Sequence, residues 1–151
     1  MLSRSLFPEL NFDYHCRELE GFVKAGRSLL PEVHWWEDDV CLTSQYDFVM
    51  VSSSLQYVRC WKEQLCDILF AVKEYLYLPR TPTVDRGPSF VAIQEAYGTR
   101  MPFWVFCESE IFNIVETAGF KLVREFASGE DFKVENAPAD VKAKSWLFRR
   151  Q

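Results

Sequence analysis

The sequence has no long apolar run and no cluster of basic residues. No stretch approaches the roughly 18 apolar residues that a transmembrane helix needs. The first eight residues lack the apolar core of a signal peptide. With a net charge of −5 and a pI near 5.1, the chain has no Lys/Arg cluster to neutralise a row of phosphates. We therefore expect a cytoplasmic protein that neither spans a membrane nor binds nucleic acid.

Metal-ligating and redox motifs are also lacking. The five cysteines are scattered and no two form a Cys-x-x-Cys pair, a pattern typical of free thiols in a reducing compartment. The close pair His15 and Cys16 occupies adjacent positions of an expected strand, so the two side chains point to opposite faces. We therefore expect no metal site. Catalytic cysteine chemistry stays open, although no histidine lies in a recognisable supporting motif.

What the sequence does contain is the composition of one ordinary globular domain. At 151 residues it is long enough to bury a core, and it is 48% hydrophobic and 26% charged. Aromatic residues reach 16%, with 13 Phe and 5 Trp. Such a content indicates an aromatic core, and a ligand-stacking wall is the alternative.

Segments with strand and helix patterns alternate along the chain, which predicts an α/β sheet. The expected strands are 12–17, 33–36, 47–51, 75–78, 120–126 and 145–149, with a short extended segment at 90–93. The expected helices are 18–30, 60–72 and 110–118, the last with Ser109 as N-cap and Gly119 at the C′ position. Residues 79–82 should end their strand, and the polar residues 131–142 should form a surface loop.

Four local motifs occur in a fixed order along these elements. They are an acidic strand end before a helix with a late glycine (residues 14–18 and Gly26), Ser-Ser-Leu-Gln-Tyr at 53–57, Arg-Thr-Pro at 80–82, and a proline-aromatic stretch at 102–106. In this order they resemble a bacterial family of methyltransferases, often found near polysaccharide or surface-glycan genes. The family belongs to the class I, Rossmann-like, S-adenosylmethionine (SAM)-dependent methyltransferases. The sequence departs from the family pattern at Glu20, where a proline is usual, and at Pro79, where an aspartate is usual.

The resemblance, which runs from about Phe12 to Arg149, implies a single methyltransferase-like domain over residues 1–151. Its sheet should be mostly parallel, with helices on both faces and an antiparallel strand pair at the C-terminus. The family's glycine-rich turn should lie a few tens of residues before Phe12, but only 11 residues precede it. We therefore expect an N-terminally truncated domain that lacks the first strand. The strands at 12–17 and 47–51 would then expose edges that must close on each other or on another chain.

The resemblance also places candidate cofactor contacts at strand ends, where ligands gather in open α/β sheets. Glu18 could accept both hydroxyl hydrogens of the SAM ribose, or act as an acid at a helix N-terminus. Glu37 or Asp38 could accept from the adenine amino group, or belong to a solvated acidic turn. Ser53 could contact the cofactor, or cap a helix.

Three further residues are candidates for the substrate side. Gln56 and Tyr57 follow the serines and could orient an acceptor. Arg80 could pair with a carboxylate or phosphate of the substrate, or be solvated at the surface. No catalytic residue is assigned, because methyl transfer from a sulfonium mainly needs proximity and in-line alignment.

The predicted function is SAM-dependent methyl transfer, by direct displacement, to a small molecule or glycan precursor. The alternative is a catalytically inactive methyltransferase-like relic that serves as an oligomerisation or partner-binding domain, with a second copy of the chain as one partner. A weaker third possibility is the binding of another nucleotide at the same sheet end.

Overall fold

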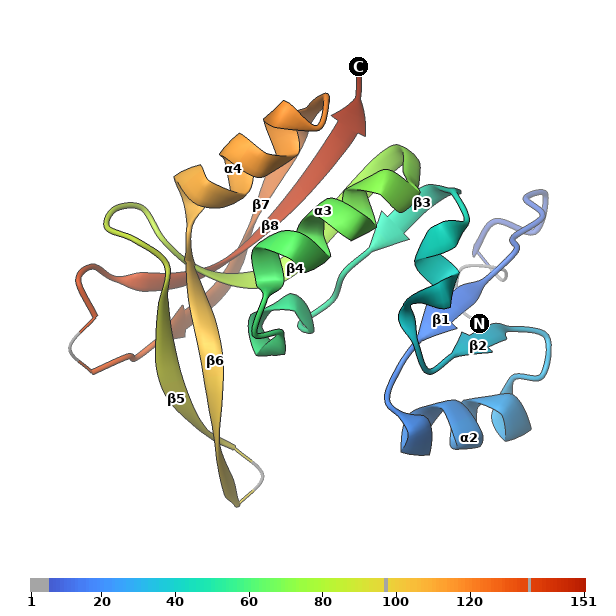
Figure 1. Ribbon diagram of the computed structural model, residues 1–151, viewed down its shortest axis with the longest axis horizontal. Helices are drawn as coiled ribbons and strands as arrows, with labels where there is room; N and C mark the ends of the chain where they lie inside the picture. The colour runs from blue at the N-terminus through green and yellow to red at the C-terminus, as the bar shows by residue number, and fades with distance from the viewer. Residues whose placement is uncertain (1–5, 97, 136) are drawn as a thin grey trace. The chain divides into compact units, whose positions relative to one another are not determined.

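A computed structural model describes residues 6–96, 98–135 and 137–151 of the chain (Figure 1). The chain divides into two compact units, residues 1–44 and 45–151, which we call the N-terminal unit and the C-terminal unit. The single domain expected for residues 1–151 stays a prediction. In the described residues, no helix is long and apolar enough to cross a membrane.

The N-terminal unit is a small parallel strand pair with one α-helix. Its elements are β1 (His15–Arg17), α2 (Glu20–Leu29), β2 (His34–Trp36) and the 3-10 helix η1 (Asp39–Thr43). β1 and β2 pair in parallel, with His15 opposite His34. The helix packs on Trp35, whose ring lies directly against the backbone of Gly26. A glycine is required there because any larger residue would place its Cβ inside the indole.

The C-terminal unit is built on a six-stranded mixed sheet. Its elements are β3 (Tyr46–Met50), η2 (Leu55–Tyr57), α3 (Trp61–Ala71), β4 (Val72–Val84), β5 (Phe90–Ala96), β6 (Thr99–Cys107), α4 (Glu108–Thr117), β7 (Phe120–Phe132) and β8 (Val141–Arg150). The strand order is β5-β6-β4-β8-β7, and β3 pairs with β4. β3 is parallel to β4, and β7 and β8 form an antiparallel pair. The α/β class and the C-terminal antiparallel pair are therefore confirmed.

The core of the C-terminal unit lies between its sheet and the helices α3 and α4, which lie side by side (Figure 1). The ring of Phe112 on α4 packs edge-on against Trp146 and Phe148 of β8, at 5.3 Å and 5.4 Å between centroids. Most of the largest side chains that are fully buried belong to this core; they include Trp146, Phe148, Phe106, Phe120, Leu65, Leu76 and Ile111. The high aromatic content is thus used mainly for packing.

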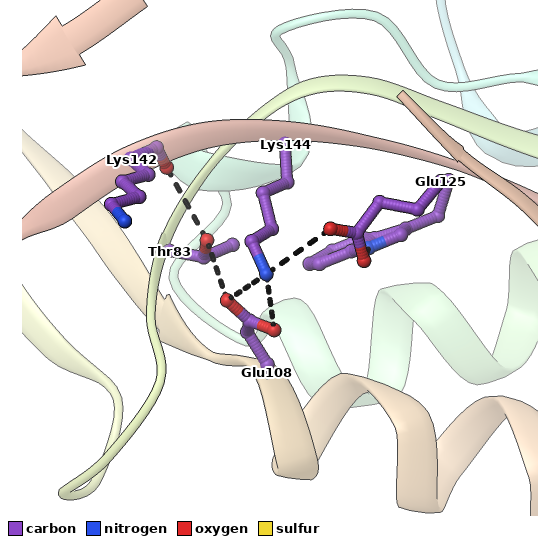
Figure 2. A network of polar contacts seen from close by, with 6 residues as sticks. Thr83, Glu108, Glu125, Lys142 and Lys144 are labelled. Carbon is purple, nitrogen blue, oxygen red and sulfur yellow. Dashed lines mark hydrogen bonds and ion pairs between the residues drawn. The ribbon is translucent and has the colours of Figure 1, made fainter. Parts of the chain in front are cut away.

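A polar network fixes the start of α4 to the sheet (Figure 2). The Lys144 ammonium lies 2.9 Å from each carboxylate oxygen of Glu108 and 3.3 Å from Glu125. Trp146 donates its indole N–H to the other oxygen of Glu125 at 3.0 Å. Partial burial lowers the pKa of Lys144, but hydrogen bonds and charge from Glu108 and Glu125 outweigh it, so the pKa is raised overall. The network therefore holds Lys144 charged and ties α4, β7 and β8 together.

Several boundaries differ from the sequence expectation. Residues 79–82 do not end a strand: β4 continues to Val84, with an irregularity between Leu78 and Thr81. β7 extends to Phe132 and β8 begins at Val141, so the connecting loop is shorter than expected. Ser109 is not the N-cap of α4, which begins after Cys107 without a side-chain cap. The Gly119 prediction is confirmed, because its φ of 86° is the left-handed conformation of a C′ residue.

The largest element that the sequence missed is a β-hairpin. The segment expected at 90–93 is the start of β5, and the proline-aromatic stretch 102–106 lies within β6. The two strands pair along their whole length, from Phe90 with Val105 to Ala96 with Thr99. In Figure 1 the hairpin extends away from the helices α3 and α4. A small second core of Val84, Phe103, Val105 and Val141 holds its base.

Candidate functional site

Glu18 lies where the sequence placed it, directly after the carboxyl end of β1. Its backbone N–H donates to the carbonyl of Trp36 at 3.0 Å, which continues the pairing of β1 with β2 by one residue. Its Oε2 accepts the N–H of Leu19 at 3.3 Å, just before α2 begins. Among the described residues, none donates a hydrogen bond to Oε1. One carboxylate oxygen thus steadies the helix entry and the other is available for a ligand hydroxyl.

The acidic residues after β2 are partly engaged. Glu37 forms an ion pair with Arg27 of α2 at 3.3 Å. Asp38 is the N-cap of η1, and its Oδ1 accepts the N–H of Val40 at 3.1 Å. Because Glu18 donates to Trp36, which directly precedes Glu37, the structure brings the three predicted carboxylates to one end of the β1–β2 pair.

Ser53 lies at the end of β3 with a left-handed backbone, at a φ of 49°. The last paired residues of β3 and β4 are Met50 and Tyr77, and the N–H of Val51 still bonds to the Tyr77 carbonyl at 3.0 Å. Ser54 is the N-cap residue of the short helix η2 that follows, but its side chain makes no capping hydrogen bond. A non-glycine residue in this conformation is strained and is often found at ligand sites.

Gln56 and Tyr57 lie on η2 but point to different surroundings. Gln56 is buried, with 9% of its surface exposed. Tyr57 is half exposed, and its hydroxyl donates to Oε1 of Gln94 on β5 at 2.7 Å. This hydrogen bond joins the segment after β3 to the β5–β6 hairpin, an association that the sequence could not predict because the hairpin itself was missed.

Arg80 lies inside β4, at the irregularity between Leu78 and Thr81. Its φ is 52°, and its backbone N–H donates to the hydroxyl of the buried Ser145 at 3.0 Å. The flanking Pro79 has no N–H to give to the sheet. The side chain of Arg80 is exposed, as either alternative from the sequence requires.

Two of the cysteines are poor candidates for nucleophiles. Burial raises the pKa of Cys16, and the Glu18 charge adds to the effect. Burial also raises the pKa of Cys41, and the nearby Arg17 only partly offsets it. Since the thiolate is the reactive form, neither thiol is activated.

The structure also brings together a cluster that the sequence reasoning missed. Asp13, His15 and His34 place their ligating atoms within 4.8 Å of one another. The expectation of no metal site considered only His15 with Cys16. The signal that could have found the cluster is the parallel pairing of β1 with β2, which sets His15 beside His34.

No protein-family model and no curated protein sequence matches this chain. Solved structures do. The N-terminal domain of EvdMO1 with SAH bound has a TM-score of 0.67 at 16% identity, covering 99% of this chain and 69% of that one. A magnesium protoporphyrin IX methyltransferase from Synechocystis PCC 6803 with bound SAM has a TM-score of 0.63 at 17% identity, covering 99% and 64%. A SAM-dependent methyltransferase from Methanosarcina mazei has a TM-score of 0.66 at 11% identity, covering 98% and 86%.

These likenesses establish the fold: the chain has the fold of class I SAM-dependent methyltransferases. It spans less than two thirds of the Synechocystis chain.

Proposed function

We propose that this chain binds SAM and contributes to a SAM-dependent methyltransferase. The observation that carries the proposal is the placement of Glu18 at the carboxyl end of β1, in a chain that matches structures with bound SAM or SAH over 99% of its length. In open α/β sheets ligands bind outside the carboxyl ends of the strands, where a carboxylate can accept the hydroxyls of a ribose.

The residues present fit the adenosine end of the cofactor. Oε1 of Glu18 takes no part in the hydrogen bond between Oε2 and Leu19, and it can accept a ribose hydroxyl. Glu37 and Asp38 keep acceptor oxygens beyond those used by Arg27 and Val40, and they can accept from an adenine amino group. The sequence has no Gly-x-Gly turn. The proposal therefore gives the N-terminal unit the adenosine end of the cofactor.

When bound, SAM supplies a methyl group on a sulfonium centre. The contribution of this chain is to hold and orient the cofactor and the acceptor, because a direct displacement depends mainly on proximity and alignment. For the C-terminal unit taken by itself, Ser53 is the proposed cofactor contact, and Gln56, Tyr57 and Arg80 are the proposed contacts of the acceptor, a small molecule or glycan precursor. The Tyr57 to Gln94 hydrogen bond steadies this segment, and the Arg80 guanidinium can pair with an anionic group.

Calorimetric titration with S-adenosylhomocysteine tests the cofactor assignment. We expect binding by the full chain, and a Glu18→Gln variant should bind about 10- to 100-fold more weakly, since a hydrogen bond to a charged group contributes about 1.5–3 kcal/mol. Glu20→Gln is the matched control, because Glu20 is an exposed carboxylate in the first turn of α2. An unchanged affinity in Glu18→Gln, or no heat up to millimolar ligand, contradicts the proposal.

The second candidate is a non-catalytic domain that associates with a second copy of the chain, and one observation favours it. β3 pairs only with β4 in the described part of the C-terminal unit. Phe48 and Met50 on this edge strand are 54% and 57% exposed. Neither proline nor lysine protects the strand against pairing with another chain. A dimer in sedimentation experiments, with no ligand heat in the same preparation, supports this candidate over the first.

A further inference from the structure

The N-terminal unit carries a second group of polar side chains, on one face of the β1–β2 pair. His15 and His34 are directly opposite each other in the parallel register, and Asp13 lies two residues before His15. Side chains two apart along an extended segment share a face. Cys16 and Trp35 alternate to the opposite face, where Trp35 meets Gly26 of α2.

Within this group the Asp13 carboxylate joins the two imidazoles. Its Oδ2 lies 3.3 Å from Nε2 of His15, and its Oδ1 lies 3.1 Å from Nε2 of His34. The two rings stack at 4.5 Å between centroids and 22° between planes. Both Nε2 atoms therefore point toward one carboxylate from adjacent strands. These are also the only two histidines in the sequence.

We propose that Asp13, His15 and His34 form a binding site for one divalent transition-metal ion of the Zn²⁺, Co²⁺ or Ni²⁺ class. Two imidazoles with a carboxylate suit these ions, whereas Mg²⁺ and Ca²⁺ prefer all-oxygen sites. Three protein ligands leave a coordination position open to water. The ion replaces the hydrogen bonds that now join Asp13 to the histidines.

The ligating atoms need only a small contraction to bind the ion. They lie within 4.8 Å of one another, and a tetrahedral ion with Zn–N bonds of about 2.0–2.1 Å places two nitrogens about 3.3 Å apart. The side chains of His34 and Asp13 are 56% and 75% exposed, so they can change rotamer at little cost in packing. His15, at 22% exposed, is the fixed member of the set.

Trp36 opposes metal binding through its hydrogen bond to His15. Its indole N–H donates to Nδ1 of His15 at 3.2 Å, so a neutral His15 carries its proton on Nε2. Coordination through Nε2 moves that proton to Nδ1 and breaks the hydrogen bond with Trp36. A net hydrogen bond contributes about 0.5–1.5 kcal/mol, which corresponds to about a two- to tenfold loss of metal affinity. Removing the indole N–H should restore that affinity.

The test is a calorimetric titration of the full chain with CoCl₂ at neutral pH, with MgCl₂ as the comparison ion. We expect one Co²⁺ per chain and no Mg²⁺ binding. Asp13→Asn and His34→Asn should each weaken Co²⁺ binding at least about tenfold. Glu9→Gln, an exposed carboxylate of the same unit, should leave it unchanged. Trp36→Phe should bind Co²⁺ about two- to tenfold more tightly, with circular dichroism to verify that each variant is folded.

Three results would overturn the site. The first is an absence of Co²⁺ binding. The second is binding that survives His34→Asn but is lost when the exposed thiols Cys60 and Cys66 are replaced by serine. The third is equal binding of Co²⁺ and Mg²⁺, which would indicate a nonspecific carboxylate surface. None of these results bears on SAH binding, so this proposal and the proposed function fail independently.

Discussion

Replacing Gly26 by alanine should destabilise the N-terminal unit, although alanine is the better helix former. A Cβ at this position would lie 2.5 Å from Cη2 and 2.6 Å from Cε2 of Trp35, and it would also overlap Cζ2. Real Cβ contacts are not this short, so the indole must move. The ring is held next to this contact, because its Nε1, which is bonded to Cε2, donates to the Leu30 carbonyl at 3.1 Å.

The magnitude follows from three opposing contributions. Overpacking costs about 1–3 kcal/mol, and loss of the Trp35 to Leu30 hydrogen bond costs about 0.5–1.5 kcal/mol. Replacing glycine within a helix returns about 0.5–1 kcal/mol. We therefore expect Gly26→Ala to lower the free energy of unfolding of the N-terminal unit by about 0.5–4 kcal/mol.

The assay is urea unfolding, followed by tryptophan fluorescence and by far-ultraviolet circular dichroism. Gly21→Ala is the matched control on the same helix, because nothing lies within 4 Å of its Cβ position. That variant should be stabilised by up to about 1 kcal/mol. The reasoning is refuted if Gly26→Ala is as stable as Gly21→Ala, since the indole would then have moved without cost.

Two further stability predictions concern the C-terminal unit. Lys144→Met should lower the free energy of unfolding by about 1–3 kcal/mol, because it leaves the partly buried Glu108 and the more exposed Glu125 without their cation. The pKa of Lys144 is raised in the folded state, so its charge stabilises the fold fully below the unfolded pKa of 10.5. This stabilisation disappears as pH rises through the folded-state pKa. Urea unfolding at pH 7 and pH 11 should therefore show a smaller difference between Lys144→Met and wild type at the higher pH. Arg80→Gly should be more stable in urea than Arg80→Ala by about 1 kcal/mol, because glycine adopts the left-handed φ without strain. Equal stabilities would mean that the backbone at this position relaxes when the side chain is truncated.

The order of elements could be predicted from the sequence because each carries its own periodicity. The apolar run of β3 and the amphipathic α3 were found within one or two residues of their bounds. The hairpin of β5 and β6 was missed because no strand was predicted for the proline-aromatic stretch 102–106, which lies within β6. Pro102 is tolerated there because β4 pairs with β6 only at Phe106 and Cys107, so one side of β6 has no neighbouring strand at Pro102 among the described residues. Non-local pairing of this kind leaves no periodic signal.

The candidate site also divides into residues that local patterns predicted and contacts that only non-local pairing creates. Glu18, Ser53 and Arg80 were found because a polar residue after an apolar strand is a local pattern. The contacts that define their surroundings are non-local, such as the Trp36 carbonyl against the Glu18 N–H or Ser145 behind Arg80. The cluster of Asp13, His15 and His34 shows most clearly what local patterns miss. Its members carry no motif as separate residues, and the strand register brings them together.

The strongest indication of a ligand site in the C-terminal unit is a pair of strained backbone conformations, at Ser53 and Arg80. Met50 and Tyr77 are the last paired residues of β3 and β4. Ser53 follows Met50 and Arg80 follows Tyr77 at the same spacing, and both have positive φ, at 49° and 52°. Each such conformation costs about 1–3 kcal/mol unless its surroundings enforce it. The Ser145 hydroxyl enforces it at Arg80. Two strained residues, each shortly after the last pair of these parallel strands, are a cost that ligand binding would explain. This is an argument for the ligand-binding proposal over the relic, because a relic has no reason to retain both.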